Sequence, residues 1–98
     1  MARVFVKAYA SARDALGGSG KIFVELSQHG DVRFLLEILS KQFGQKFVET
    51  VLDESGSPKK MFKIFMNGRD IDFHDGLATV LNEGDEVALV PPVAGGCF

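Results

Sequence analysis

A chain of 98 residues has room for one domain, and its 46% hydrophobic content, with nine phenylalanines, is sufficient to fill a core. Its formal net charge of −2 argues against a nucleic-acid-binding protein that relies on phosphate contacts. The sequence has no apolar run of about 18 residues, no secretory pattern, one cysteine and no histidine–cysteine cluster. We therefore expect a cytoplasmic domain without a membrane span, an internal disulfide or a metal site.

The first part of the chain predicts a β-hairpin. Residues 3–9 and 21–27 combine alternating polarity with β-branched and aromatic side chains, which is typical of strands. Residues 10–20 between them are small and rich in glycine, which predicts a loop. We therefore expect an antiparallel pair of strands joined by a long loop.

The next segment predicts the main helix. Asp31 is a suitable N-cap, Gly44 follows the expected last turn, and apolar side chains recur every three or four residues as far as Phe43. A shorter helical pattern follows over residues 46–53. The apolar stripe of the main helix indicates a face that is buried against a sheet.

The second half of the chain predicts the remainder of that sheet. Residues 61–66 are strand-like and end at Asn67-Gly68, a strong turn signal. Ile71 and Phe73 suggest a short edge strand, and residues 77–81 predict about one turn of helix. Residues 86–90 then predict the last strand.

This order of elements describes the β-grasp, or ubiquitin-like, arrangement. We expect an α+β fold with a mixed sheet of four to five strands and one main helix packed across one face, formed by residues 1–90. Pro91-Pro92 ends the last strand because proline lacks an amide donor. Residues 91–98 are therefore expected to form a flexible tail, in which Gly95-Gly96 can pass through a narrow channel.

The order of elements over the whole domain resembles a known family, and the resemblance is most specific in residues 67–96. Residues 87–96, a strand stopped by prolines and followed by Val-Ala-Gly-Gly, resemble the C-terminus of the ubiquitin-like sulfur carriers of the MoaD/ThiS superfamily. Asn82-Glu83-Gly84-Asp85 before the last strand extends this resemblance. Gly76-Leu77-Ala78-Thr79, together with the Pro-x-Val-Ala-Gly-Gly ending, is most similar to CysO-like carriers.

The resemblance implies a carrier that has no catalytic side chain and binds no cofactor. An E1-like adenylating enzyme would adenylate the Gly96 carboxylate with ATP, and sulfur would then replace AMP to leave a thiocarboxylate. A sulfur-accepting synthase would use it to form cysteine, homocysteine or a siderophore-type thio compound. The residues that these partners would recognise are Pro91, Pro92, Val93, Ala94, Gly95 and Gly96.

The chain departs from the family pattern after Gly96, where Cys97 and Phe98 follow. A peptide bond cannot be adenylated in place of a carboxylate, so this form is expected to be an inactive precursor. A resemblance to the carrier of thioquinolobactin assembly implies that a JAMM-type zinc protease cuts between Gly96 and Cys97. ATP and zinc are then expected on partner enzymes rather than on this chain.

The outward positions of the predicted strands are apolar as well. Alternation that places their neighbours under the helix sends Phe5, Phe65, Ala88 and Val90 to the opposite face of the sheet. A β-grasp fold has no second helix to cover that face. We therefore expect a docking surface for the activating enzyme there, unless loops or a dimer cover it.

Other interpretations stay open. The small subunit of a molybdopterin synthase and a thiazole-pathway carrier share the sulfur chemistry, although Cys97-Phe98 argues against the first. A ubiquitin-like modifier would be joined to lysines of target proteins, and a simple interaction module would make no use of Gly95-Gly96. The remaining polar candidates are expected to be ordinary loop residues, without a ligand: His29, His74, Asp70, Asp72 and Asp75.

Overall fold

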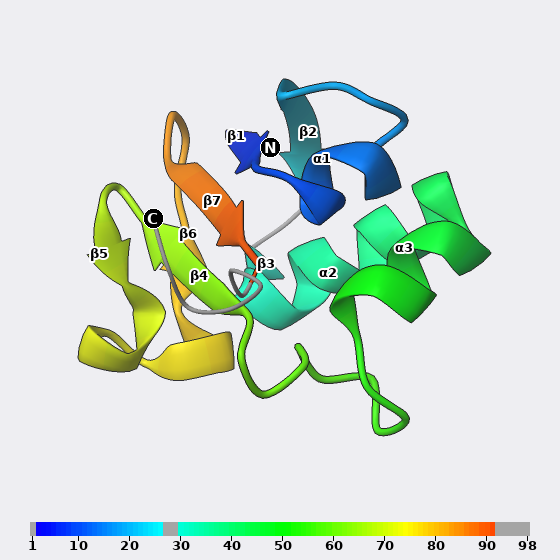
Figure 1. Ribbon diagram of the computed structural model, residues 1–98. Coiled ribbons are helices and arrows are strands. Elements are labelled where there is room, and N and C mark those ends of the chain that lie inside the picture. The colour runs from blue at the N-terminus through cyan, green and yellow to red at the C-terminus, as the bar shows by residue number, and fades with distance from the viewer. Residues whose placement is uncertain (1, 27–29, 92–98) are drawn as a thin grey trace.

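A mixed five-stranded sheet is the framework of the structure, a computed structural model that describes residues 2–26 and 30–91 (Figure 1). The strand order is β2-β1-β7-β4-β5; β1 runs parallel to β7, and the other neighbouring pairs are antiparallel. The last strand in sequence therefore lies in the middle of the sheet. The strands are β1 (Ala2–Ala8), β2 (Lys21–Leu26), β4 (Lys63–Met66), β5 (Arg69–Asp70) and β7 (Glu86–Val90).

Helices pack on one face of this sheet. The main helix begins as predicted, because Asp31 Oδ1 accepts the N–H of Phe34 at 2.9 Å, and it ends at Gly44, which has a φ of 72°. The helices are α1 (Ser11–Ala15), α2 (Val32–Phe43) and α3 (Gln45–Val51). A mixed sheet with its helices on one face confirms the predicted α+β, β-grasp fold.

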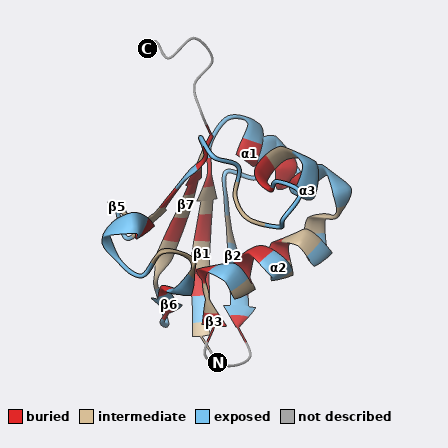
Figure 2. Ribbon diagram, turned by 90° about the horizontal axis from the view of Figure 1, so that it is seen from below, coloured by how far each residue is buried: buried red, intermediate tan, exposed pale blue. Residues whose placement is uncertain are grey.

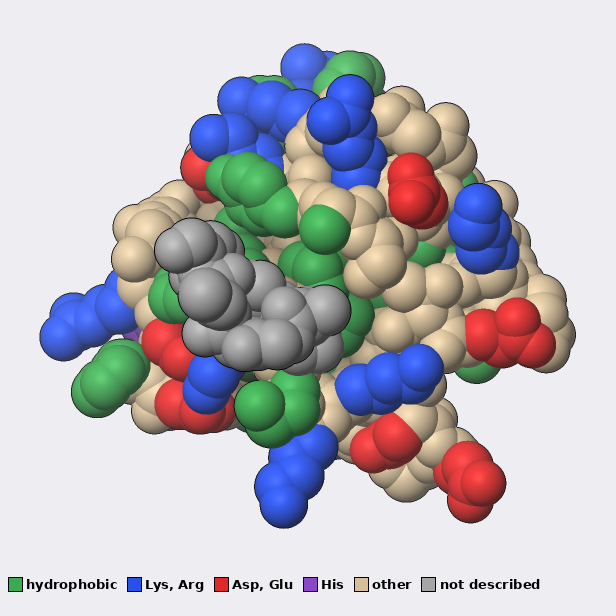
Figure 3. Space-filling view, in the orientation of Figure 1, with side chains coloured by type: hydrophobic (Ala, Val, Ile, Leu, Met, Phe, Trp, Pro, Cys, Tyr) green, Lys and Arg blue, Asp and Glu red, His purple; other side chains and the backbone are tan. Residues whose placement is uncertain are grey.

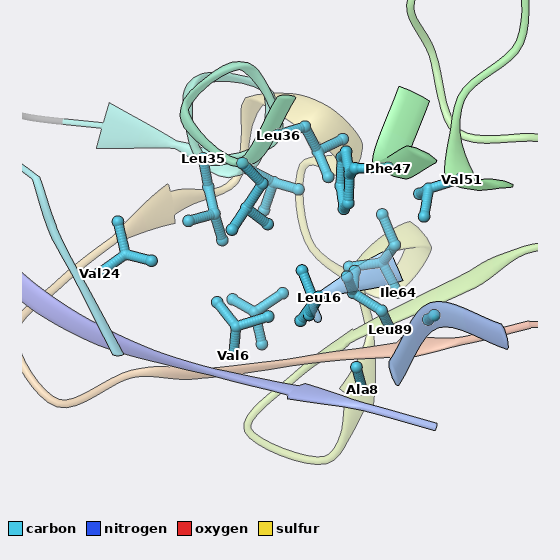
Figure 4. Packing of buried hydrophobic residues seen from close by; sticks show 14 of the residues in the cluster. Val6, Ala8, Leu16, Val24, Leu35, Leu36, Phe47, Val51, Ile64 and Leu89 are labelled. Carbon is cyan, nitrogen blue, oxygen red and sulfur yellow. The ribbon is translucent and has the colours of Figure 1, made fainter. Parts of the chain in front are cut away.

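The side chains between the sheet and the helices form the core. The inward positions predicted from alternation are all buried, with at most 3% of any residue exposed. Figure 4 shows Val6 and Leu89 of the sheet facing Leu35 of α2 and Phe47 of α3. In Figure 2, β1 and β7 accordingly alternate between buried and half-buried bands. The inward strand residues are Val4, Val6, Ile64, Val87 and Leu89.

The expected loop of residues 10–20 contains a helix that sequence reasoning missed. Helix α1 buries Ala12 and Ala15, and Leu16 follows them into the core. Its five residues are too few to show a helical period in the sequence. The glycine-rich stretch after Leu16 is the part of the predicted loop that remains irregular.

The edge strand predicted at Ile71 and Phe73 is wrong. These residues belong to a 3₁₀ helix, η1 (Ile71–Phe73), and the edge strand β5 lies immediately before it. Asp70 causes the change, because its Oδ1 accepts the N–H of Asp72 at 2.9 Å and turns the backbone out of the strand. The preceding strand is also shorter than the predicted 61–66, since β4 begins at Lys63.

The helical turn predicted over residues 77–81 is too long. A 3₁₀ helix, η2, covers Gly76–Ala78, and β6 (Val80–Leu81) then pairs with β3 (Gly30–Asp31) in a small second sheet. Thr79 fixes this transition: its buried hydroxyl accepts the N–H of Asp75 at 3.0 Å and donates to the carbonyl of Gly76 at 2.7 Å.

Candidate functional site

The predicted tail begins where β7 ends, in the middle of the sheet. On one side the N–H of Tyr9 donates to the carbonyl of Leu89 at 3.3 Å, and on the other side Val90 faces Lys63 of β4. The strand ends there because Pro91, itself buried, has no N–H for the ladder. The other predicted tail and cleavage residues lie outside the described residues: Pro92, Val93, Ala94, Gly95, Gly96 and Cys97.

The face of the sheet opposite the helices has an open groove beside the end of β7, which we call the outer groove. Lys7 of β1, Ala88 of β7 and Phe65 of β4 are direct register partners and form a row across its floor. In the view of Figure 3, hydrophobic side chains gather near the middle of the molecule, and charged side chains surround them. The groove is lined by Lys7, Tyr9, Phe65, Gly68, Glu86, Ala88 and Val90.

Three of the four predicted docking residues, Phe65, Ala88 and Val90, line the outer groove together, and each is half-buried. The fourth, Phe5, lies one step along the sheet, opposite Glu86. Its half-buried ring carries the Lys21 ammonium 5.0 Å from the ring centre, so a cation rather than solvent lies over it. Phe5 therefore adjoins the outer groove without lining it.

Sequence reasoning missed four residues of the outer groove: Lys7, Tyr9, Gly68 and Glu86. Tyr9 is 48% exposed, and Lys7 is half-buried beside Ala88. The signal was present in the sequence, because Lys7 and Tyr9 continue the outward alternation that begins at Phe5. An aromatic ring with a hydroxyl gives the groove a wall that can both pack against a partner and donate a hydrogen bond to it.

Ion pairs border the outer groove. Glu86 lies 3.8 Å from the Lys7 ammonium and 3.5 Å from the Lys21 ammonium, and Lys63 lies 3.8 Å from Asp70. The three lysine side chains are 39–56% exposed, and exposed pairs of this kind contribute only about 0–1 kcal/mol to stability. These lysines can therefore turn toward a partner at little cost to the fold.

The other polar candidates occupy structural positions. Asp70 caps the η1 turn and pairs with Lys63, and His74 is an exposed residue just after that turn. Among residues 2–26 and 30–91, no group of three histidine, cysteine, aspartate or glutamate side chains has the arrangement of a metal site. His29 lies outside the described part of the chain.

Asp53 carries a carboxyl group whose pKa is lowered from its ordinary value. The hydroxyl of Ser55 donates to its carboxylate at 2.6 Å and lowers the pKa of Asp53, with help from the N–H groups of Ser55 and Ser57. This carboxylate closes the loop after α3, and it is not one of the residues that line the outer groove. The Asp53 carboxylate therefore stabilises a turn and is not part of the candidate site.

Comparison with known proteins places the chain in a family. The model of the ThiS family matches residues 6–96, which include the end of β1, the residues that line the outer groove and the diglycine. The chain belongs to the ThiS family. The match ends at Gly96, and Cys97 and Phe98 of this ThiS-family chain lie beyond the matched residues. In the described part of the chain, no helix is long and apolar enough to span a membrane.

Several named proteins are similar to this ThiS-family chain. A protein of Archaeoglobus fulgidus, provisionally described as a sulfur carrier protein, is 42% identical over 65 residues, which are 66% of this chain and 73% of that protein. The sulfur carrier protein CysO of Mycobacterium tuberculosis is 43% identical over 51 residues, 49% of this chain and 54% of CysO. The small archaeal modifier protein 3 of Haloferax volcanii is 47% identical over 45 residues. The matched stretches cover only about half of these last two proteins.

Solved structures share the whole fold. The small archaeal modifier protein 1 of Methanosarcina acetivorans superposes with a TM-score of 0.78 at 29% identity, and the alignment covers 98% of both chains. The crystal structure of Mycobacterium tuberculosis CysO superposes with a TM-score of 0.73 at 27% identity, over 92% of this chain and 99% of CysO. These likenesses extend over nearly the complete domain, in agreement with the β-grasp order of elements.

Proposed function

We propose that this protein is a sulfur carrier that works through the carboxyl group of Gly96. The observation that supports this most strongly is the family match that continues through the tail and ends at Gly96. Two features of the domain agree with it: β7 stops at a proline in the middle of the sheet, and an open apolar groove lies beside that point. The protein then acts as a cosubstrate, and the catalytic groups belong to its partners.

The proposed chemistry needs two steps at one carboxyl group, the first at its oxygen and the second at its carbon. The Gly96 carboxylate attacks the α-phosphate of ATP on an adenylating enzyme, which forms the acyl-adenylate and releases pyrophosphate. A sulfur donor then attacks the carbonyl carbon and expels AMP, so the C–O bond to phosphate is replaced by a C–S bond. Adenylation is required because a free carboxylate is a poor electrophile, whereas AMP is a good leaving group.

We propose that the partner enzymes bind residues 91–98 as a flexible tail. Cys97-Phe98 is removed before Gly96 is adenylated. A JAMM-type zinc protease adds one water across the Gly96–Cys97 peptide bond and frees the carboxylate. The family match that stops at Gly96 supports this cleavage position. The five residues from Pro92 to Gly96, when extended, reach roughly 16 Å into a partner at about 3.3 Å per residue.

The outer groove is the surface on which we propose that the adenylating enzyme docks. Its lining lies around the end of β7, so an enzyme seated there receives the tail without moving the domain. Phe65, Ala88 and Val90 supply apolar area, and the lysines at the border supply charges that can reorient. Phe5 extends the same surface beyond the groove.

Intact-mass measurement of the protein purified from its native host tests the proposal. We expect loss of Cys97-Phe98 and a gain in mass that corresponds to sulfur in place of one oxygen. The same chain expressed in a host without the partner enzymes serves as the control and should keep both residues. Protein from the native host that retains Cys97-Phe98 throughout, with no sulfur added, would contradict the proposal.

A second candidate function is a ubiquitin-like modifier. The stretch that is 47% identical to small archaeal modifier protein 3 favours it, because that protein is named as a modifier. In this case Gly96 would form isopeptide bonds with lysines of target proteins. The same mass-spectrometry experiment, applied after tryptic digestion of the host proteins, distinguishes lysine adducts of the tail from the thiocarboxylate.

A further inference from the structure

Strand β2 forms one edge of the main sheet, and part of its backbone has no partner there among the described residues. The N–H of Ala8 donates to the carbonyl of Gly20 at 3.0 Å, which sets the alternation of hydrogen bonds between β1 and β2. Residues of an antiparallel strand point their backbone groups alternately toward and away from a neighbour. Ile22 and Val24 therefore face β1, whereas the backbone groups of Lys21, Phe23 and Glu25 point to the free edge.

Nothing in the described residues occupies this edge. Within residues 2–26 and 30–91, no backbone hydrogen bond joins the outward groups of Lys21, Phe23 and Glu25 to another segment. Their side chains keep exposed surface: Phe23 is 57% exposed, and the side chains of Lys21 and Glu25 are 52% and 47% exposed. Within the chain, Lys21 lies 3.5 Å from Glu86, Glu25 lies 3.7 Å from Arg3, and the Arg3 guanidinium lies 5.1 Å from the centre of the Phe23 ring, so these exposed contacts rearrange when a second strand binds. An exposed strand edge with an exposed aromatic side chain is a template for pairing with another strand.

The order of side chains along β2 makes it complementary to itself. When two copies of the strand run antiparallel with Phe23 opposite Phe23, Lys21 of each copy faces Glu25 of the other, and Ile22 faces Val24. Directly opposed side chains on one sheet face lie about 5 Å apart, close enough for ion pairs and aromatic contacts. A lysine on an edge strand ordinarily discourages pairing, and here the glutamate opposite supplies its counter-charge.

We propose that this protein forms a two-fold symmetric dimer through its β2 strands, with a second copy of the chain as the occupant of the free edge. The inference goes beyond the proposed function and does not depend on it. The two five-stranded sheets join into one continuous sheet. The contact is isologous, since the same patch serves on both copies.

Backbone geometry selects this register among the possible ones. The free donors and acceptors belong to Lys21, Phe23 and Glu25, so only a register that sets these residues opposite one another can use them. A slip of one residue would bring side chains on the outer face of one copy opposite side chains on the helix-covered face of the other copy. A slip of two residues would place Phe23 against Lys21 or Glu25 and leave one edge residue without a partner.

The same register extends the apolar surface across the dimer. Phe5 is the cross-strand partner of Phe23 within one copy, so the dimer aligns Phe5 and Phe23 of one copy with Phe23 and Phe5 of the other. Opposed aromatic pairs on a sheet face are stabilising. Because β1 separates β2 from β7, the end of β7 and the outer groove of each copy stay outside the contact.

Sedimentation equilibrium of the full chain tests the dimer, in a phosphine reductant that prevents a disulfide through Cys97. A contact along one strand edge is smaller than a standard protein interface, so we expect a dissociation constant of about 10 μM to 1 mM. Lys21→Glu and Glu25→Lys each place like charges opposite each other twice and should weaken the dimer by about tenfold or more. The double variant Lys21→Glu/Glu25→Lys should recover the wild-type constant.

Lys7→Glu is the matched control, because Lys7 shares the partner Glu86 with Lys21 and the net charge changes by the same amount. It lies one strand away from the edge and should leave the dimer unchanged. A wild-type chain that remains monomeric at about 1 mM overturns the proposal. So does a Lys21→Glu effect no larger than that of Lys7→Glu, or a double variant that stays as weak as the single ones.

Discussion

The same strands build both faces of the main sheet, yet the two faces are covered differently. Leu89 and Ile64 are at most 3% exposed beneath the helices, whereas their chain neighbours Val90 and Phe65 are half-buried on the outer face. In the described part of the chain, helices α1, α2 and α3 pack on the inner face alone. The difference indicates that the inner face supplies most of the stability of the domain, and it agrees with the proposal that the outer face serves for recognition.

Adjacent residues of β7 test that division most directly. Leu89→Ala should lower the free energy of unfolding by about 2–5 kcal/mol, because it removes buried methyl groups and leaves a cavity beneath the helices. Val90→Ala, one residue further on the other face, should lower it by about 1 kcal/mol or less. Equilibrium denaturation in guanidinium chloride measures both values. If the two variants lose the same free energy of unfolding, the two faces contribute equally to the stability of the domain.

A glycine in the small second sheet tests how tightly the inner side is packed. A Cβ at Gly30 would lie 2.9 Å from Phe34 Cδ2 and 3.0 Å from Leu26 Cδ1, so Gly30→Ala should destabilise the domain by about 1–3 kcal/mol. Gly20→Ala is the control, since its Cβ would meet only Arg13 Nε, at 3.8 Å. Thermal unfolding followed by circular dichroism compares the two, and a Gly30→Ala protein as stable as Gly20→Ala would show a loose inner layer.

The inner face was largely predictable from the sequence because its signals are local. Alternation in β1, β4 and β7 identifies the buried positions, and the apolar stripe of α2 with its Asp31 cap identifies the helix above them. Three residues of the outer groove followed from the same alternation, although Lys7, Tyr9, Gly68 and Glu86 were overlooked. Both results depend on side-chain periods that a short window of sequence contains.

The parts that could not be predicted depend on distant contacts or on single hydrogen bonds. Strand β6 exists because it pairs with Gly30–Asp31, far away in the sequence, and no local pattern records that pairing. The turn of η1 depends on one bond from the Asp72 N–H to Asp70, which overrides the strand preference of Ile71 and Phe73. Helix α1 is stabilised by packing against α3 and β1 rather than by its five residues alone.

Substitutions on the outer face should weaken binding to a partner more than they lower the stability of the domain. Phe65→Asp should change the free energy of unfolding by less than about 1 kcal/mol, because the side chain is only half-buried. The same change places a charge in the outer groove and should weaken productive binding to the adenylating enzyme by about tenfold or more. ATP–pyrophosphate exchange with the chain processed to Gly96 measures this as a rise in KM.

Phe73→Asp separates an effect of the outer groove from a general effect of lost aromatic surface. Phe73 is 73% exposed and is not one of the residues that line the groove, so the same substitution there removes a larger exposed ring at another place. We expect the KM of the Phe73→Asp chain to equal that of the wild type. If Phe65→Asp and Phe73→Asp raise KM equally, the outer groove has no special role in docking. If Phe65→Asp instead unfolds the domain, the outer face contributes to stability as the inner face does, and the contrast between the two faces fails.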